Sequence, residues 1–283
     1  MKYYVIIPAH NEEAFLADTL NSILRQTVQP EKVVVVNDNS TDGTEAIIDT
    51  FQALSPIFQK LNTESSSEHM PGSKVINAFT KGLALLDNQY DIIVKLDADL
   101  ILPNIYFEKI IDIFKGHPNV GIAGGFVYEK NGNDQWQLNH PMDKNHVRGA
   151  FKAYSKPCFT SIGGLRSAMG WDTADELLAQ YHDYEIFTDT ELKVKHLRPT
   201  GKAYNPKAKL LQGIAMYRMR YGIIITAIAS AKMALKQRKL LAFKDNLYGF
   251  LKARKAGLPF LINEEEGKFV RKLRWKNIKQ KLL

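Results

Sequence analysis

The stretch DIIVKLDADLILP, residues 91–103, joins an apolar segment directly to two carboxylates. Residues 92–96 are typical of a strand that is buried on both faces. Asp97 and Asp99 follow at once, with a single alanine between them. Two carboxylates this close repel each other unless a cation lies between them. The pair is therefore either a turn signal, for which Asp is a common residue, or part of a cation site.

The same alternation of strand and helix extends outward from this stretch. The apolar run at 3–8 and the segment EKVVVVNDNS at 31–40 predict two further buried strands, and residues 11–27, 41–51 and 74–88 have helical spacing. This order predicts a mostly parallel α/β sheet flanked by helices. Farther on, we expect strands within 119–130, 149–165 and 187–201, a helix at 173–184, polar loops at 62–73 and 131–146, and a mainly helical region beyond 210. Glycines in the strand at 119–130 predict close backbone approach.

Polar clusters follow three of the predicted strands. They are PAHNE at 8–12, NDNSTD at 37–42 and DAD at 97–99. Ligands collect at the carboxyl ends of the strands in open parallel sheets, so all three clusters should meet at one edge. This convergence favours a ligand site over a turn role for Asp97 and Asp99. Carboxylate oxygens suit Mg²⁺ or Mn²⁺, which commonly bridge to a diphosphate.

The three motifs occur in a specific order: VIIPAHNEE at 5–13, VVVVNDNSTDGT at 33–44 and IVKLDADL at 93–100. In this order the chain resembles the family 2 glycosyltransferases, which have a GT-A fold. The resemblance is strong over residues 1–110, looser from 160 to 200, and ends at about 210. It implies a GT-A-type nucleotide-binding sheet and a nucleotide-diphospho-sugar donor.

The resemblance also implies roles for individual residues. Asp38 stands where the family hydrogen-bonds the base, although Asn37 replaces a usual Asp. Lys74 stands where a basic residue often approaches the nucleotide, but a surface lysine at a helix start is an equal alternative. His196 would be either a third metal ligand, a diphosphate contact or a structural histidine. Arg198 would pair with a phosphate. The implied nucleotide-binding residues are Pro8, Ala9, His10, Asn11, Glu12, Asp38, Lys74 and Asp97, and the implied metal ligands are Asp99, Asp97 and His196.

An inverting sugar transfer needs one more carboxylate, which takes the proton from the acceptor hydroxyl. The family places it at the start of a helix after a glycine-rich loop, and IGGLRSAMGWDTADELLAQY at 162–181 offers this pattern, with Trp171 as a stacking surface for a sugar. We expect Asp175 to be the base, then Glu176, then Asp172. The family order is Glu before Asp, which is reversed here. The alternative is that these acids only favour a helix N-terminus.

Charge divides the chain unevenly. Residues 193–283 hold 23 Lys and Arg against 4 Asp and Glu, whereas residues 1–192 hold 15 against 26. Basic and apolar residues alternate in the tail, as in helices that bind anionic membrane surfaces; an ordinary packed helix is the alternative, and we expect no nucleic-acid partner. We therefore predict a glycosyltransferase domain at 1–210 and a basic helical extension at 211–283, packed on it or facing a membrane.

The predicted activity is the addition of one sugar to a glycan or lipid-linked acceptor, in surface polysaccharide or lipid-linked glycan synthesis. A processive synthase would add several membrane spans and a Gln-x-x-Arg-Trp motif, and we find neither in the sequence. No signal peptide is apparent and the lone Cys158 excludes a disulfide framework, so we expect a cytoplasmic protein, peripheral on the inner face of the membrane. The alternatives are a non-catalytic nucleotide-binding transferase and a sugar nucleotidyltransferase.

Overall fold

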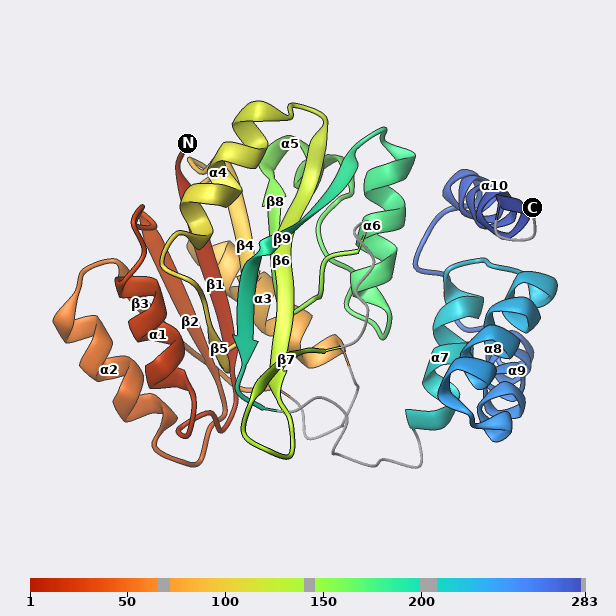
Figure 1. Cartoon of the computed structure of the whole chain (residues 1–283), viewed down its shortest axis with the longest axis horizontal. Helices are drawn as coiled ribbons and strands as arrows, with labels where there is room; N and C mark the ends of the chain where they lie inside the picture. Colours follow the sequence, from red (N-terminus) through yellow and green to blue (C-terminus); the bar gives the residue numbers. More distant parts are fainter. Residues whose placement is uncertain (66–71, 140–145, 199–207, 281–283) are drawn as a thin grey trace. The chain divides into compact units, whose positions relative to one another are not determined.

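Over the residues that the computed structural model describes, 1–65, 72–139, 146–198 and 208–280, nine strands form one sheet (Figure 1). The predicted loops at 62–73 and 131–146, and the end of the strand region predicted at 187–201, lie partly outside these residues. The strand order is β3-β2-β1-β4-β8-β6-β9-β5, with β7 paired to β6. The strands are β1 (Tyr3–Ala9), β2 (Lys32–Asp38), β3 (Phe58–Thr63), β4 (Ile92–Leu96), β5 (Leu100–Ile101), β6 (Val120–Lys130), β7 (Trp136–Leu138), β8 (Phe151–Ser155) and β9 (Glu185–His196).

The helices divide between two compact units of the chain. One unit contains the sheet and its flanking helices, which are α1 (Leu16–Leu24), α2 (Thr44–Leu54), α3 (Ser73–Leu85), α4 (Tyr106–Gly116) and α5 (Lys156–Ser161). The other contains α6 (Trp171–Tyr181), α7 (Ala208–Arg218), α8 (Ile223–Gln237), α9 (Leu240–Lys255) and α10 (Glu264–Gln280). The predicted α/β class and the helical C-terminal part are thereby confirmed.

The sheet is parallel where strands and helices alternate in the sequence. β3, β2, β1 and β4 run parallel to their neighbours, and their apolar side chains fill the core of the first unit. β8 instead pairs antiparallel with both β4 and β6. No helix separates β6 from β8 among the described residues, and an antiparallel pair needs no helical crossover. The sheet is therefore mixed, with a parallel half that ends in the polar clusters.

Glycines allow the close approaches that the sequence predicts in β6. A Cβ added to Gly125 would lie 2.2 Å from the carbonyl oxygen of Leu192 on β9. A Cβ added to Gly121 would lie 2.5 Å from the sulfur of Cys158, which is fully buried in α5. Cys158 therefore packs as a small apolar residue beside the sheet, in agreement with a structural role.

Some elements carry no clear signal in the sequence. β3 is an edge strand with half-exposed polar residues, so it lacks the apolar run that marks β1 and β2. β5 and β7 have two and three residues, and such short segments are set by pairing with β9 and β6 rather than by local preference.

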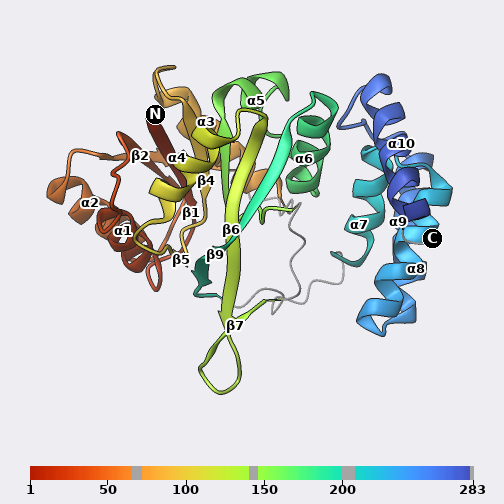
Figure 2. The same ribbon diagram turned by 45° about the horizontal axis from the view of Figure 1, so that its top comes forward.

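In the second unit, α7 and α9 pack through glycines. A Cβ on Gly213 of α7 would lie 1.8 Å from the carbonyl oxygen of Asn246, and one on Gly249 of α9 would lie 2.3 Å from that of Leu210. The two backbones are thus almost in contact, and Figure 2 shows α7 and α9 as neighbouring helices. Within the described part of the chain, we find no helix with the length and apolar character needed to cross a membrane.

Replacing Gly213 by Ala tests this helix packing. The added methyl group must push the backbone of α9 away, so we expect the free energy of unfolding to fall by about 2–3 kcal/mol. The matched control is Gly116→Ala, where an added Cβ meets nothing within 4 Å. Urea unfolding followed by circular dichroism measures both changes. Equal losses in the two variants would contradict the close packing of α7 and α9.

Candidate functional site

A cleft of about 400 Å³ opens at the carboxyl edge of the parallel strands, within the first unit. A volume in this range holds a small organic ligand. The register places Pro8 of β1 beside Val36 of β2, and Ile6 of β1 beside Lys95 of β4, so the three strands end at nearly the same level. The predicted polar clusters are thereby brought together. The lining residues are Pro8, Ala9, His10, Glu12, Asp38, Ser65, Lys74, Val75, Ala78, Asp97, Ala98, Asp99 and Arg198.

All the predicted nucleotide-binding residues line this cleft except Asn11. Asn11 has a left-handed backbone (φ 54°), and its side-chain oxygen accepts a hydrogen bond from the Thr41 N–H at 2.8 Å. Its own N–H donates to the Ser40 hydroxyl at 3.1 Å. Asn11 therefore ties the loop after β1 to the loop after β2, a bracing position outside the lining.

Asp38 lies at the end of β2 and is held from the neighbouring strand. The hydroxyl of Thr63, the last residue of β3, donates to its carboxylate at 3.2 Å, and the backbone oxygen of Asp38 is 2.7 Å from His10 Nδ1. Beside it, the buried Asn37 side chain donates to Asn62, but its own oxygen has no hydrogen-bond partner. A buried acceptor without a donor costs free energy until a ligand or water supplies one.

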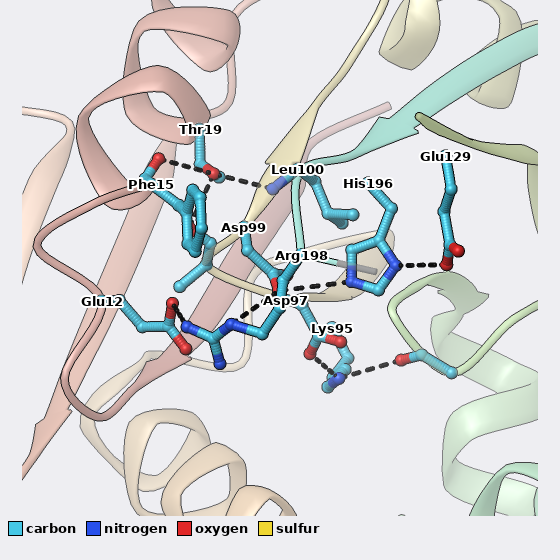
Figure 3. A network of polar contacts seen from close by, with 12 residues as sticks. Glu12, Phe15, Thr19, Lys95, Asp97, Asp99, Leu100, Glu129, His196 and Arg198 are labelled. Atoms are coloured by element: carbon cyan, nitrogen blue, oxygen red, sulfur yellow. Dashed lines mark hydrogen bonds and ion pairs between the residues drawn. The ribbon is translucent and has the colours of Figure 1, made fainter. Parts of the chain in front are cut away.

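Asp97 is paired with Lys95, two residues before it on the same side of the chain (Figure 3). Lys95 is 1% exposed, contacts the Asp97 carboxylate and donates to the Gly149 carbonyl at 2.9 Å. Burial raises the pKa of Asp97, while the Lys95 ammonium acts in the opposite direction and Asp99 adds to the increase. Lys95 was not expected at the site, although a lysine inside an otherwise apolar strand is a signal that the sequence contains.

Asp99, His196 and Glu129 form a row of three interacting side chains that come from different strands or strand ends. His196 Nε2 lies 3.3 Å from Asp99, and His196 Nδ1 lies 3.2 Å from Glu129 at the end of β6. Burial disfavours a charged imidazole, but the hydrogen bonds to Asp99 and Glu129 outweigh it and raise the pKa of His196. The pairing of β5 with β9 brings Asp99 to His196, and the pairing of β6 with β9 places Glu129 opposite His196. Glu129 was not expected from the sequence, because nothing near it in the chain indicates a site.

Arg198 reaches the cleft two residues beyond His196, as its spacing predicts. Its guanidinium donates to Glu12 at 2.6 Å, and its Nε lies 4.0 Å from the nearer Asp99 oxygen (Figure 3). The side chain is half exposed and lies over the ring of Phe15. Burial raises the pKa of Glu12 to about 7, because the nearby carboxylates of Asp99 and Asp97 add to burial and outweigh Arg198.

The side chains of the cleft can hold a divalent cation only together with oxygen atoms from a bound ligand or water. Among the described residues, no group of three or more His, Cys, Asp or Glu side chains is arranged to hold a metal ion. Asp99 and His196 lie next to each other, whereas Asp97 is engaged by Lys95. Mg²⁺ and Mn²⁺ are commonly held by one or two protein groups together with phosphate oxygens and water. Asp99 and His196 can supply the protein part of such a site.

The predicted base residues lie on α6, in the second unit, whereas the residues that line the cleft lie in the first. Asp175 and Glu176 are buried, at 1% and 6% exposure, and the Asp175 carboxylate accepts a hydrogen bond from the Glu176 N–H at 2.7 Å. Asp172 is partly exposed in the first turn, and Trp171 is buried at the helix start. Glu176 is close enough to the buried Tyr221 to raise the pKa of its hydroxyl, an effect secondary to burial.

Comparison with known proteins identifies similar sequences and folds. A family model described as Glycosyl transferase family 2 matches residues 4–169. A glucosyl-dolichyl phosphate glucuronosyltransferase of Haloferax volcanii is 23% identical over 246 residues, which cover 80% of this chain and 73% of that protein. The chain spans about a third of the length of the first curated relatives that it matches.

Two solved structures share the fold. A mannosyltransferase from Pyrobaculum calidifontis in complex with GDP-Man and Mn²⁺ superimposes with a TM-score of 0.57 at 17% identity, over 95% of this chain and 78% of that one. S. aureus TarS 1-349 in complex with UDP-GlcNAc gives a TM-score of 0.56 at 17% identity, over 78% of this chain and 65% of that one. Both likenesses indicate a GT-A fold.

Replacing Glu12 by Gln tests the electrostatics of the cleft through stability. A carboxyl whose pKa is about 7 in the folded chain and 4.5 in the unfolded chain binds more protons when folded, so its contribution to stability falls as pH rises from 4.5 to 7. We expect wild type to lose about 1 kcal/mol relative to E12Q over this interval, because solvent screening weakens the effect of a partly solvated group. Urea unfolding in metal-free buffer at several pH values measures this difference, and parallel profiles for the two chains would contradict it.

Proposed function

The chain belongs to glycosyl transferase family 2, and we propose that it transfers one sugar from a nucleotide-diphospho-sugar to an acceptor hydroxyl, with inversion at the anomeric carbon. The observation that carries this proposal is the meeting, in one cleft, of Asp38, the Asp97 and Asp99 pair, and Arg198. These groups match the three parts of such a donor: a base with N–H donors, a ribose and sugar with hydroxyls, and an anionic diphosphate.

In this proposal, the nucleobase of the donor lies beside β2. Asp38 accepts a hydrogen bond from Thr63 and retains acceptor capacity for a base N–H. Asn37 does not line the cleft, so its unpaired side-chain oxygen is not part of this contact. UDP-GlcNAc and GDP-Man in the two similar structures are donors of this class.

The charge of the cleft explains why a cation would be needed. Four carboxylates line it, from Glu12, Asp38, Asp97 and Asp99, against two cations, Lys74 and Arg198. Lys95 beneath the cleft offsets Asp97 and leaves a smaller negative balance, so a diphosphate would bind better with a further positive charge. A divalent ion held by Asp99 and His196 would supply that charge and stabilise the leaving diphosphate. Arg198 and Lys74 would bind the remaining phosphate oxygens, with Arg198 exchanging Glu12 for phosphate.

The chemical step joins the acceptor oxygen to the anomeric carbon while the bond from that carbon to the diphosphate breaks. The acceptor proton passes to a carboxylate, and we assign this role to Asp175, with Glu176 and Asp172 as successive alternatives. Trp171, which the sequence suggests as a stacking surface for a sugar, is 7% exposed at the start of α6 and offers no open aromatic face in this structure. The nucleoside diphosphate leaves with the electron pair of the broken bond.

A lipid-linked or polysaccharide acceptor is part of the proposal. The Haloferax volcanii relative is named for a glucosyl-dolichyl phosphate, and a similar lipid-linked glycan would be a natural acceptor here. Such an acceptor would place the protein on the cytoplasmic face of the cell membrane.

Nucleotide binding can be tested before any acceptor is known. We expect UDP, GDP or dTDP, but not all three equally, to raise the midpoint of thermal unfolding by several degrees with Mn²⁺ and far less without it, because a ligand of the folded state stabilises it. Asp99→Asn should remove the Mn²⁺ dependence, whereas the control Asp112→Asn, on the exposed side of α4, should keep it. No rise with any nucleotide would count against the donor site.

The assignment of the base predicts which carboxylate controls the rate. Asp175→Asn should slow release of the nucleoside diphosphate by about 100-fold or more, since general-base catalysis contributes on this scale, while leaving the nucleotide-dependent thermal shift intact. The assay uses nucleotide-sugars that contain the nucleoside diphosphate selected by the thermal shift, with a membrane lipid extract as acceptor. Glu176→Gln and Asp172→Asn are compared with Asp175→Asn. If none of the three slows release, the base lies elsewhere or the chain binds nucleotides without catalysis.

A further inference from the structure

The turn between α8 and α9 exposes an unusual set of apolar side chains. Leu235, Leu240 and Leu241 are 72%, 76% and 70% exposed, more than any other large apolar residue among those described. They stand within seven residues of one another, at the end of a helical hairpin (Figure 2). We call Leu235, Leu240 and Leu241, with the basic residues between and beside them, the hairpin tip.

The hairpin tip is also strongly basic. Lys236, Arg238, Lys239 and Lys244 are all exposed around the three leucines. Residues 231–257 contain eight Lys and Arg and a single acid, Asp245. Exposure of leucine side chains to water is unfavourable, and closely spaced cations repel one another. A partner that is both apolar and anionic would relieve both effects at the same place.

The backbone holds the hairpin tip in a defined shape. Arg238 adopts a left-handed conformation (φ 52°), a position that usually favours glycine. The Lys239 N–H donates to the Ala234 carbonyl at 2.9 Å, and the Arg238 N–H to the Leu235 carbonyl at 3.2 Å, so the end of α8 is closed by hydrogen bonds. The leucines and cations therefore project from an ordered turn.

Apolar stripes continue from the hairpin tip along both helices. On α8, Ile224 and Ile228 are exposed at helical spacing. On α9, Tyr248 and Leu251 are exposed on the side opposite to Gly249 and its contact with α7. The exposed face thus extends over the hairpin while the opposite face of α9 is packed.

We propose that the hairpin tip and these stripes dock on the surface of a bilayer that contains anionic lipids. The leucines enter the boundary between headgroups and acyl chains, and the Lys and Arg side chains extend to lipid phosphates. A second copy of the chain would oppose like charges at the hairpin tip. A nucleic acid would be bound by cations with aromatic stacking surfaces rather than by aliphatic leucines. The docking does not depend on sugar transfer.

Vesicle co-sedimentation of the full chain tests the proposal. We expect binding to vesicles of phosphatidylcholine mixed with phosphatidylglycerol, and about tenfold weaker binding to phosphatidylcholine alone or at high salt. The variants L240S/L241S and K236Q/K239Q should each weaken binding to the mixed vesicles by about tenfold or more. The matched controls are L54S/L85S and K81Q/K115Q, which alter exposed residues of the first unit and should leave binding unchanged.

A site-specific label gives an independent readout. Cys158 is buried, so an environment-sensitive fluorophore can be attached to Leu241→Cys, with Leu54→Cys as the control. We expect the emission at position 241 to shift to the blue with mixed vesicles, and the emission at position 54 to stay constant.

Three results would overturn the docking proposal. The first is no binding to mixed vesicles, or equal losses in tip and control variants. The second is a tip variant that changes the oligomeric state but not vesicle binding, which would make a second copy the partner. The third is a tip variant that loses affinity for single-stranded RNA while keeping that for vesicles, which would make the partner a nucleic acid.

Discussion

The shared register of β1, β2 and β4 is the constraint on which the cleft depends. Their side chains are almost completely buried on both faces of the sheet, so a slip of one residue would exchange the two faces and disrupt the packing of both. Because the register cannot slip, the residue after each strand is fixed relative to the other two. Asp38, Asp97 and the loop that starts at His10 meet at one edge for this reason.

Three of the four carboxylates at that edge each have a basic partner. Lys95 lies beneath Asp97, His196 beside Asp99, and Arg198 over Glu12. Burying several carboxylates together is unfavourable unless such partners are present. The three partners differ in exposure: Lys95 is enclosed in the sheet, whereas Arg198 is half exposed. Arg198 is thus the partner that can most readily exchange a carboxylate for a phosphate.

The chain separates two kinds of surface. Its first 192 residues are acidic in balance and supply every residue that lines the cleft except Arg198, which follows them closely. The basic residues gather in the helical region, where the α8–α9 hairpin presents them together with exposed leucines. The acidic cleft suits a ligand that arrives with a cation, while the basic hairpin suits an anionic surface, so the charge distribution assigns the two regions to different partners.

The sequence alone was sufficient to predict the strands of the parallel half of the sheet and most residues that line the cleft. Buried strands such as residues 92–96 show as continuous apolar runs, and the polar residues that follow them are read directly from the chain. Asn11 was expected in the lining and instead braces two loops, because its left-handed backbone turns its side chain toward Thr41.

Only the tertiary structure showed the remaining contacts. Thr63 and Glu129 reach the site through strand pairing with partners far away in the sequence. β8 takes an antiparallel place that no local pattern specifies. The exposure of Leu235, Leu240 and Leu241 could not be predicted either, since their helical spacing also fits a packed helix. Local preference and periodicity determine which segments form strands or helices, but long-range pairing determines which residues become neighbours.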